Sequence, residues 1–342
     1  MSVHDWVIYQ LLDSRGPGGI ETHVLNLSCW LNDHGYRNEV IFLKDHGAHP
    51  LKDALSAQGV HWRCLERYSD LGHLVTHTPS LLCTHGYKAG ILGRLVGRFN
   101  RTPVVSTYHS GDRGRGKLRI YSWLDEITAL FADRVISVSA EISARLPVSS
   151  QQIVNFISSQ KLPHQRGKAV AFVGRLSEEK GPESFARATL NLETPCHVYG
   201  DGPLRDELQS AYKHLRFFGH VDMQTHWPEI GLLCITSSYE GLPLVALEAM
   251  VRGIPVASYA IGGLPELIED QRTGWLVPPR DETTLNKTIQ LWSLKSPTDK
   301  AAMAVAAHHH IARHYSDDSV CPKIIALYKQ AIQHKGALLA GL

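Results

Sequence analysis

Short apolar runs alternate with longer amphipathic stretches along the first half of the chain. The runs have the length and the Val, Ile and Leu content of buried strands. We expect strands at 6–12, 37–44, 80–85, 102–109 and 134–140. Between them, stretches such as 20–35 and 86–99 space their apolar residues as one face of a helix does. This alternation predicts a mainly parallel sheet with helices on both faces.

The alternation weakens over residues 146–168, which are rich in Ser, Gln and Pro, and then begins again. We expect further strands at 169–175, 195–201, 214–221, 232–238, 254–260 and 273–279. The tail is expected to be helical over about 283–313 and 318–336. The pattern therefore predicts an α/β protein with two doubly wound sheets, joined by 146–168. Ligands of such sheets bind beyond the carboxyl ends of the strands, so we expect the site in a cleft between the two.

Length and composition agree with two domains. The chain has 342 residues, of which 43% are hydrophobic, and this suits two domains of about 150 residues each. A formal net charge of +2 does not call for a nucleic-acid partner. The cysteines stand singly, without a CxxC pair, so we expect free thiols in a reducing compartment. The first residues lack the pattern of a signal peptide, and no apolar run has the length of a membrane span, so any membrane contact should be peripheral.

The stretch SSYEGLPLVALEAMVRGIP, residues 237–255, combines a predicted helix with two acids. Pro243 suits a first turn, and the helix should run from about 243 to 252. Its free amides and dipole favour an anion such as a phosphate. Glu240 and Glu248 are poor neighbours for phosphate and better acceptors for sugar or ribose hydroxyls. A helix cap and a buried acid without a ligand explain the stretch equally well.

Cations and glycines follow other predicted strands. In FVGRLSEEKGP, residues 172–182, Arg175 and Lys180 come after Gly174 at a strand end, a pairing that suits a diphosphate; two solvated surface cations are the alternative. In DSRGPGGIETHVLNLS, residues 13–28, the glycines precede the first helix and let backbone amides approach a ligand, although an ordinary turn fits too. Neither a GxGxxG nor a GxxxxGK[ST] motif occurs.

Histidines and a basic segment complete the candidates. His109 and His85 lie at strand ends, where an imidazole can bond to a hydroxyl or move a proton. RGRGKLR, residues 113–119, is either a solvated loop or a contact for an anionic acceptor or lipid head groups, to which Arg94 and Arg98 could add. The run of three histidines at 308–310 points in three helical directions, so we expect no shared metal there.

Taken together and in this order, these stretches resemble the retaining glycosyltransferases of family 4, which have the GT-B fold. The resemblance covers nearly the whole chain and is strongest over 170–280, where FVGRLSEEKG, YGDGP, FFGHV and the stretch at 237–255 follow one another. Glu240 and Glu248 carry the E-x7-E spacing of the family. GPGGIETHVLNL and STYHS are similar to the glycine loop and the histidine loop of the family.

The resemblance implies two Rossmann-like domains facing across a cleft. The acceptor-side domain would comprise 1–163, with a helix at about 318–342 crossing back to it. The donor domain would comprise 164–317.

The resemblance also implies roles for individual residues. Arg175 and Lys180 would hold the donor diphosphate, Glu240 a hydroxyl of the donor sugar, and Glu248 the ribose. His109 would touch the donor sugar and, with Glu240, Arg175 and Lys180, form the catalytic set. The donor site would further include Gly18, Gly19, Gly174, Gly200, Gly202, Gly219, His220, Val221, Gly241, Leu242, Pro243, Leu244 and Glu248. Acceptor or membrane contacts are expected at His85, Lys88, Arg113, Arg115, Lys117 and Arg119.

The implied reaction moves a sugar from a nucleotide-diphosphate sugar to a glycan or lipid-linked acceptor, with retention and without a metal or other cofactor. The sequence offers no evident second carboxylate for double displacement, so we expect attack on the face from which the phosphate departs. Polysaccharide or cell-envelope glycan synthesis, on the cytoplasmic face of a membrane, is the expected setting. Alternatives are a nucleotide-sugar epimerase or hydrolase on the same fold, and an inactive partner subunit.

Overall fold

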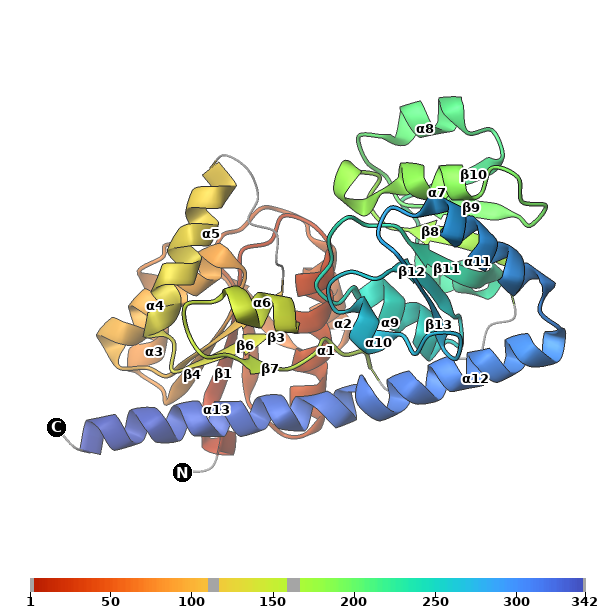
Figure 1. Ribbon diagram of the computed structural model, residues 1–342. Coiled ribbons are helices and arrows are strands. Elements are labelled where there is room, and N and C mark those ends of the chain that lie inside the picture. The colour runs from red at the N-terminus through yellow and green to blue at the C-terminus, as the bar shows by residue number, and fades with distance from the viewer. Residues whose placement is uncertain (1–2, 110–116, 159–166, 341–342) are drawn as a thin grey trace. The chain divides into compact units, whose positions relative to one another are not determined.

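The chain folds into two compact units (Figure 1). The computed structural model describes residues 3–109, 117–158 and 167–340. Unit 1 comprises Met1–Ser158 with Asp317–Leu342, and unit 2 comprises Ser159–Ser316. The division falls a few residues before the expected one at 163, and the last helix belongs to unit 1 as the resemblance implies.

Unit 1 contains a seven-stranded sheet in the order β3-β2-β1-β4-β5-β6-β7, in which every pairing is parallel. The five expected strands are present. The sequence did not predict β3, which is half-exposed and has no apolar run, or β7, a two-residue strand inside the polar connection. The strands are β1 (Val7–Leu12), β2 (Asn38–Phe42), β3 (His61–Cys64), β4 (Ser80–His85), β5 (Val104–Tyr108), β6 (Arg134–Ser137) and β7 (Gln151–Gln152).

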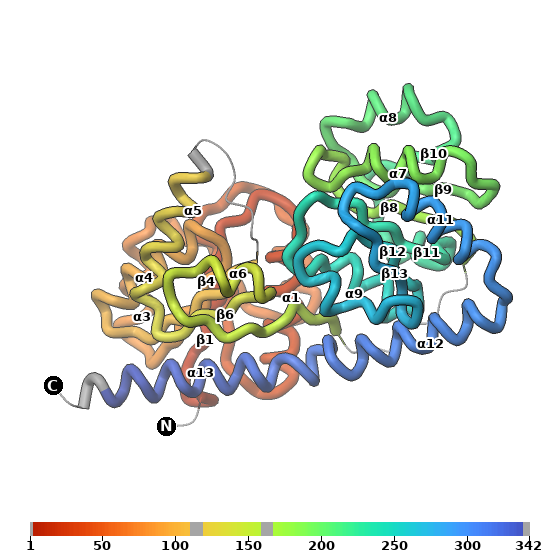
Figure 2. Tube along the Cα trace, in the orientation of Figure 1, coloured from red at the N-terminus to blue at the C-terminus, as the bar shows by residue number. Residues whose placement is uncertain are grey.

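Helices cover both faces of this sheet, because alternate residues of each strand point to opposite sides. Ile8 of β1 packs in one core cluster with residues of α1 and α13, whereas Tyr9 and Leu11 pack in another with residues of α3 and α4. Figure 2 traces α13, which returns to unit 1 at the end of the chain. The helices are η1 (Val3–Asp5), α1 (Gly19–Asp33), α2 (Pro50–Ala57), α3 (Asp70–Thr76), α4 (Tyr87–Asn100), α5 (Lys117–Thr128), η2 (Ala129–Phe131), α6 (Ala140–Arg145) and α13 (Asp317–Ala340).

Unit 2 contains a six-stranded parallel sheet in the order β10-β9-β8-β11-β12-β13. All six strands lie where the sequence predicts them. They are β8 (Ala169–Val173), β9 (Cys196–Tyr199), β10 (Leu215–Gly219), β11 (Ile230–Ile235), β12 (Val256–Tyr259) and β13 (Gly274–Val277). The strand order reverses beside β8, so the loops after β8 and β11 meet at the point where doubly wound sheets bind ligands.

In unit 2, α7 packs against α11, and α9 packs against α12. The single tail helix expected over 283–313 is two helices, α11 and α12, because Ser296 caps a new helix whose first residue is Pro297. The helices are η3 (Glu178–Lys180), α7 (Pro182–Ala188), α8 (Arg205–Ala211), η4 (Met223–Thr225), η5 (Trp227–Glu229), α9 (Leu244–Val251), α10 (Leu264–Leu267), α11 (Glu282–Leu294) and α12 (Pro297–His314).

Two further sequence expectations concern the whole chain. All six cysteines are free thiols, and four of them are buried. Within the described ranges, no helix has both the length and the apolar character that crossing a membrane requires.

Candidate functional site

In unit 2, backbone bonds join the loops that follow β8 and β11. The amide of Ser238 donates to the carbonyl of Glu179 (2.8 Å), and the hydroxyl of Thr236 donates to the carbonyl of Gly181 (2.8 Å). Two stretches that are about sixty residues apart in sequence, 172–182 and 237–255, therefore form one surface. Parallel pairing of β8 with β11 places them there, since both strands end at the same edge.

Lys180 and Glu240 are the charged centre of this surface. Lys180 Nζ lies 2.6 Å from Glu240 Oε1, and the hydroxyl of Ser237 donates to the same oxygen at 2.6 Å. Arg175 is exposed on the loop before η3, close enough to Glu179 to help lower its pKa, although the hydrogen bond from Ser177 lowers that pKa most.

The N-terminus of α9 opens directly after this acid. Pro243 is its N-cap, with extended backbone and no side-chain hydrogen bond to the first amides, so these amides are available to an anion. The preceding turn is held by a bond from the amide of Gly263 to the carbonyl of Gly241 (2.6 Å). Gly262 has φ +53°, and a Cβ there would lie 1.8 Å from the carbonyl oxygen of Glu240, so only glycine fits.

Glu248 lies within α9 in a desolvated environment. Burial raises its pKa, and the positive charge of Arg252 opposes this only in part. Arg252 donates to the carbonyl of Glu248 (2.7 Å) and to Gln224 Oε1 (2.8 Å) rather than to the carboxylate. A carboxyl group in this condition gains from any ligand that hydrogen-bonds its charged form.

The loops after β9 and β10 lie against the loop after β8. The amide of Gly174 donates to Tyr199 (2.9 Å), and that of Gly200 donates to Gly219 (2.8 Å). A Cβ on Gly200 would lie 1.9 Å from the carbonyl oxygen of Gly174, so the close approach requires glycine. Three further residues of the predicted donor site are in the same loops: Gly202 and Val221 are half-buried, and His220 is exposed.

In unit 1, His109 follows β5 and meets two other histidines. His85, the last residue of β4, pairs in register with Thr107, which places its ring beside the loop of His109. His85 Nδ1 lies 2.9 Å from His109 Nε2, and His85 Nε2 donates to Gln10 Oε1 at 2.7 Å. In the neutral ring His85 Nδ1 is then an acceptor, so His109 donates to it.

His23 of α1 is the third member of this group. Its ring centroid lies 4.6 Å from that of His109 and 5.5 Å from that of His85. Burial lowers the pKa of His109 to about 4 and holds those of His23 and His85 well below the usual value. All three rings are neutral near pH 7, so His109 can exchange hydrogen bonds with a ligand but cannot contribute a positive charge.

The glycine loop lies after β1. Gly18 and Gly19 are exposed, and Gly18 caps α1 without a side-chain bond. Beside it, Asp13 binds Lys88 and lies 2.8 Å from His46 Nε2. Burial opposes ionisation of Asp13, but the hydrogen bonds from Lys88 and His46 outweigh it, and the pKa of Asp13 is lowered.

Some predicted acceptor or membrane residues do not reach the surface. His85 is 2% exposed, because β4 is a central strand, so the prediction that it contacts a membrane or acceptor is wrong. Arg94 is 1% exposed and does not add to a basic patch, because it binds Asp125 (2.5 Å) and ties α4 to α5. Lys88 is half-buried against Asp13.

The basic segment 113–119 belongs only in part to the described residues. Arg113 and Arg115 lie outside the described residues, as does the side chain of Lys117, and Arg119 and Arg98 are exposed.

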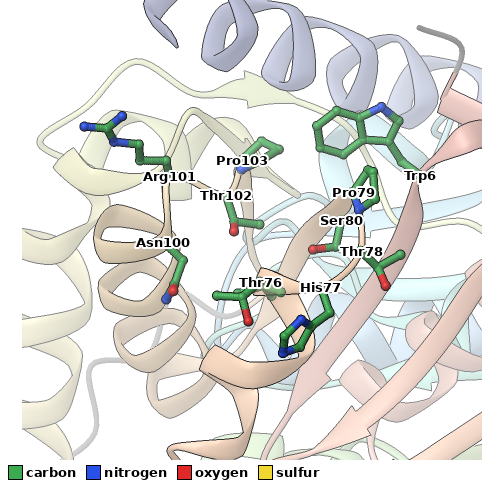
Figure 3. Close-up of a pocket in the computed structure, with 11 residues that line it drawn as sticks. Trp6, Thr76, His77, Thr78, Pro79, Ser80, Asn100, Arg101, Thr102 and Pro103 are labelled. Carbon is green, nitrogen blue, oxygen red and sulfur yellow. The ribbon is translucent and has the colours of Figure 1, made fainter.

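A pocket of about 310 Å³ in unit 1 lies at the opposite edge of its sheet (Figure 3). Its lining includes Trp6, Ser80 and Pro103, which lie at or just before the first residues of β1, β4 and β5. The predicted site residues follow the carboxyl ends of strands. The pocket therefore contains none of them.

Sequence reasoning missed several residues of these surfaces. Ser237 lies three residues before Glu240 in SSYEG, and its hydroxyl could have been predicted as a hydrogen-bond donor to that acid. His23 lies in GGIETHVLNL, but its helical position gave no reason to group it with two strand-end histidines. Gly262 was visible as part of a double glycine after a predicted strand.

Comparison with known proteins agrees with this geometry. Residues 17–147 match the family described as Glycosyltransferase Family 4, and residues 167–293 match Glycosyl transferases group 1. The chain is 27% identical over 312 residues to the glycogen synthase of Mycobacterium tuberculosis, covering 78% of this chain and 72% of that protein. It is 27% identical over 215 residues to the GalNAc-alpha-(1->4)-GalNAc-alpha-(1->3)-diNAcBac-PP-undecaprenol alpha-1,4-N-acetyl-D-galactosaminyltransferase of Campylobacter jejuni, covering 56% and 58%.

Among solved structures, the chain is similar to HepE of Anabaena in complex with UDP and glucose. The TM-score is 0.82 at 19% identity, over 94% of this chain and 99% of that one. Two parallel Rossmann-like sheets of this kind define the GT-B fold. With both halves matched, the chain belongs to glycosyltransferase family 4, and it is a glycosyltransferase.

Proposed function

We propose that this protein transfers a sugar, with retention of configuration, from a nucleotide-diphosphate sugar to a glycan or lipid-linked acceptor. The observation that carries the proposal is the pair of Lys180 and Glu240, 2.6 Å apart beside the open N-terminus of α9. One cation, one hydroxyl-binding acid and a set of free amides are the groups that a sugar diphosphate requires. HepE, with a similar fold, is described in complex with UDP and glucose.

The roles follow from charge. The donor diphosphate takes Lys180 as a partner, together with Arg175 and the first amides of α9. These groups stabilise the negative charge that builds on the leaving diphosphate, so we propose that transfer needs no metal. Glu240 accepts a hydrogen bond from a donor-sugar hydroxyl through Oε2, while Oε1 keeps the bond from Ser237.

Glu248 binds the ribose in this scheme. Burial raises its pKa, and hydrogen bonds from two ribose hydroxyls would stabilise the charged carboxylate. Gly200, Gly219 and Val221 line the base pocket, and from unit 1 the resemblance adds Gly18, Gly19 and His109. Attack of the acceptor on the face that the diphosphate leaves accounts for retention without a second nucleophile.

Thermal melting with UDP, GDP, ADP and CMP in turn, without metal, tests the donor site. A nucleotide at about 100 times its Kd adds about 2.7 kcal/mol of stability, so the right base should raise the Tm. The shift should disappear in Lys180→Ala. If no nucleotide shifts the Tm of the wild type, the donor site is wrongly assigned.

Product analysis separates the alternatives. With donor alone, a transferase leaves most of the donor intact, a hydrolase releases free sugar, and an epimerase forms a second nucleotide sugar. Lys180, Arg175, Glu240 and Glu248 are all present, which favours an active enzyme over an inactive partner subunit.

For the acceptor side, we propose that unit 1 docks on an anionic membrane surface through α4, α5 and η2. In α5, Ile120, Trp123 and Ile127 recur at helical spacing on the exposed side. An apolar face with aromatic residues, flanked by the exposed cations Arg98, Arg101 and Arg119, fits a lipid interface. The exposed apolar side chains of this face are Leu95, Phe99, Ile120, Tyr121, Trp123, Leu124, Ile127, Leu130 and Phe131.

Flotation with vesicles tests the docking face. Wild type should float with vesicles that contain anionic lipid and much less with neutral ones. Phe99→Ser and Trp123→Ser should each weaken flotation, whereas Leu294→Ser, at an equally exposed leucine of α11 in unit 2, should not. If removing the charges of Arg98 and Arg119 changed neither flotation nor transfer, the proposal would be contradicted. It would also be contradicted if the wild type self-associated and Trp123→Ser abolished that association, because the face would then bind a second copy.

A further inference from the structure

Three imidazoles from different elements of unit 1 meet in its interior. His23 comes from α1, His85 from the end of β4, and His109 from the loop after β5. One ring nitrogen of each lies within 4.8 Å of the other two. His23 is 3% exposed and His85 is 2% exposed, while His109 is half-buried and faces outward most. Three neutral rings therefore share one small volume without a carboxylate or thiol among them.

Existing hydrogen bonds account for only part of this group. His85 donates from Nε2 to Gln10 Oε1 (2.7 Å), and the amide nitrogen of Gln10 lies 3.5 Å from the hydroxyl of Tyr328 on α13. These contacts aim His85 Nδ1 at His109. The side chain of Asn155 lies beside His23 and His109 and partly offsets the lowering of their pKa values, but His23 Nδ1 itself is buried and makes no well-formed hydrogen bond in the described part of the chain. A buried ring nitrogen without a partner is costly unless something else binds there.

The arrangement matches a known pattern of metal binding. A metal-ligating histidine usually donates its second nitrogen to a fixed oxygen, as His85 does to Gln10. Zinc–nitrogen bonds of about 2.0–2.1 Å place tetrahedral ligand nitrogens roughly 3.4 Å apart. His85 Nδ1 and His109 Nε2 are 2.9 Å apart, and the widest spacing in the cluster is within 4.8 Å, so small ring rotations reach that geometry.

We propose that His23, His85 and His109 bind a divalent transition metal of the Zn²⁺ class and that the bound metal inhibits transfer. Three neutral nitrogen ligands select Zn²⁺, Co²⁺, Ni²⁺ or Cu²⁺ over Mg²⁺ and Ca²⁺. The metal replaces the proton between His85 Nδ1 and His109 Nε2, and His109 then carries its proton on Nδ1. The inhibition rests on the proposed function, in which His109 touches the donor sugar. The metal is then an inhibitor rather than a cofactor.

Another pair of histidines has to be separated from this site. His310 and His314 of α12 are four residues apart, with ring centroids 5.2 Å apart, so they offer a two-ligand surface site. A two-ligand site binds metal without the tetrahedral geometry of three fixed imidazoles. His314→Ala is therefore the control variant, and the protein has to be free of a histidine tag.

The experiment is a Co²⁺ titration followed by visible absorption, with Zn²⁺ affinity measured by calorimetry, both without donor. Wild type and His314→Ala should develop the intense bands of tetrahedral Co²⁺, and Zn²⁺ should displace it. His23→Leu should lose those bands. Gln10→Leu removes the hydrogen-bond acceptor of His85 Nε2 and should lower the Zn²⁺ affinity about 10- to 100-fold. Loss of His23 should lower the Zn²⁺ affinity more.

Several results would overturn the proposal. One is a wild-type spectrum that matches His23→Leu; another is tight binding that His314→Ala removes. If His23→Leu does not fold, as judged by its Tm without metal, His109→Gln at the half-buried position replaces it and should also lose the bands. Because binding is read without donor, an inactive enzyme does not affect it. If Zn²⁺ binds at the cluster but transfer does not slow, the inhibitory role is wrong.

Discussion

The two units present different chemistry at the same edge of the same kind of sheet. In unit 1, three neutral histidines gather at this edge: His85 and His109 from strand ends and His23 from α1, with only His109 partly exposed. In unit 2, the strand ends carry an ion pair, an exposed arginine and a helix N-terminus. The doubly wound topology places both sites at the carboxyl ends of the strands, but the loops and their exposure to solvent decide which side chains are charged there. The comparison separates the charges of unit 2, which suit a diphosphate, from the neutral donors and acceptors of unit 1.

Burial acts in the same sense in both units. It lowers the pKa of His109 and raises that of Glu248, since each ring or carboxyl is more stable uncharged. The consequences for stability have opposite signs. Histidines with lowered pKa values cost stability as the pH falls, whereas a glutamic acid with a raised pKa costs stability as the pH rises.

The largest expected effect is that of Lys180→Ala. Removing the cation should lower kcat about 100- to 1000-fold, because the leaving diphosphate loses its main counter-charge. The Tm should change little. Lys52→Ala is the matched control, since Lys52 also lies 2.6 Å from its acid, Asp45, but in unit 1. Equal loss of activity in both variants, or a collapse of the Tm in Lys180→Ala, would mark the site pair as structural.

Glu248→Gln should lower kcat/KM about ten- to a hundredfold, as expected for lost hydrogen bonds to a charged group. The same change should raise the Tm at pH 7.5. The wild-type carboxyl adds stability below its unfolded pKa of 4.5 and loses it as the pH rises through its higher folded pKa, whereas glutamine does not titrate. The Tm advantage should therefore vanish near pH 4. A variant less stable than wild type at pH 7.5 would contradict the raised pKa.

Two glycines allow a smaller test of the site loops. Gly262→Ala should cost about 1–3 kcal/mol, because its φ is +53° and the new Cβ would meet the carbonyl of Glu240. Gly16→Ala in unit 1 should leave the Tm unchanged or slightly higher, since nothing lies within 4 Å of its Cβ position. Urea denaturation measures both. If both variants changed the free energy of unfolding by the same amount, the backbone around residue 262 would be able to shift and make room for the new Cβ.

The smallest effect concerns acid stability. A pKa of about 4 for His109 means that its contribution to stability is complete above the unfolded value of 6.5 and is lost as the pH falls toward 4. At pH 5.5 this loss is about 1 kcal/mol for one histidine. His109→Gln should remove that part of the decline in the free energy of unfolding between pH 7.5 and 5.5. An unchanged decline would show that His109 is not buried in solution.

The sequence predicted the fold well because strand periodicity and helix boundaries are local. It placed all six strands of unit 2 and five of the seven in unit 1, and it missed β3 and β7, whose residues lack an apolar run. It also predicted Lys180 and Glu240 as site residues, because glycine and proline beside them marked the strand and helix ends. It misjudged His85 and Arg94, since burial depends on neighbours far away in the chain.

The sequence by itself therefore determined two doubly wound sheets and the loops that follow their strands. Only the tertiary structure decided what those loops do together. It placed Lys180 against Glu240 across sixty positions, and it gathered His23 with His85 and His109 from three elements. The physical reason is that pairing and desolvation arise from contacts between distant segments, and these contacts exist only once the strands have assembled in order.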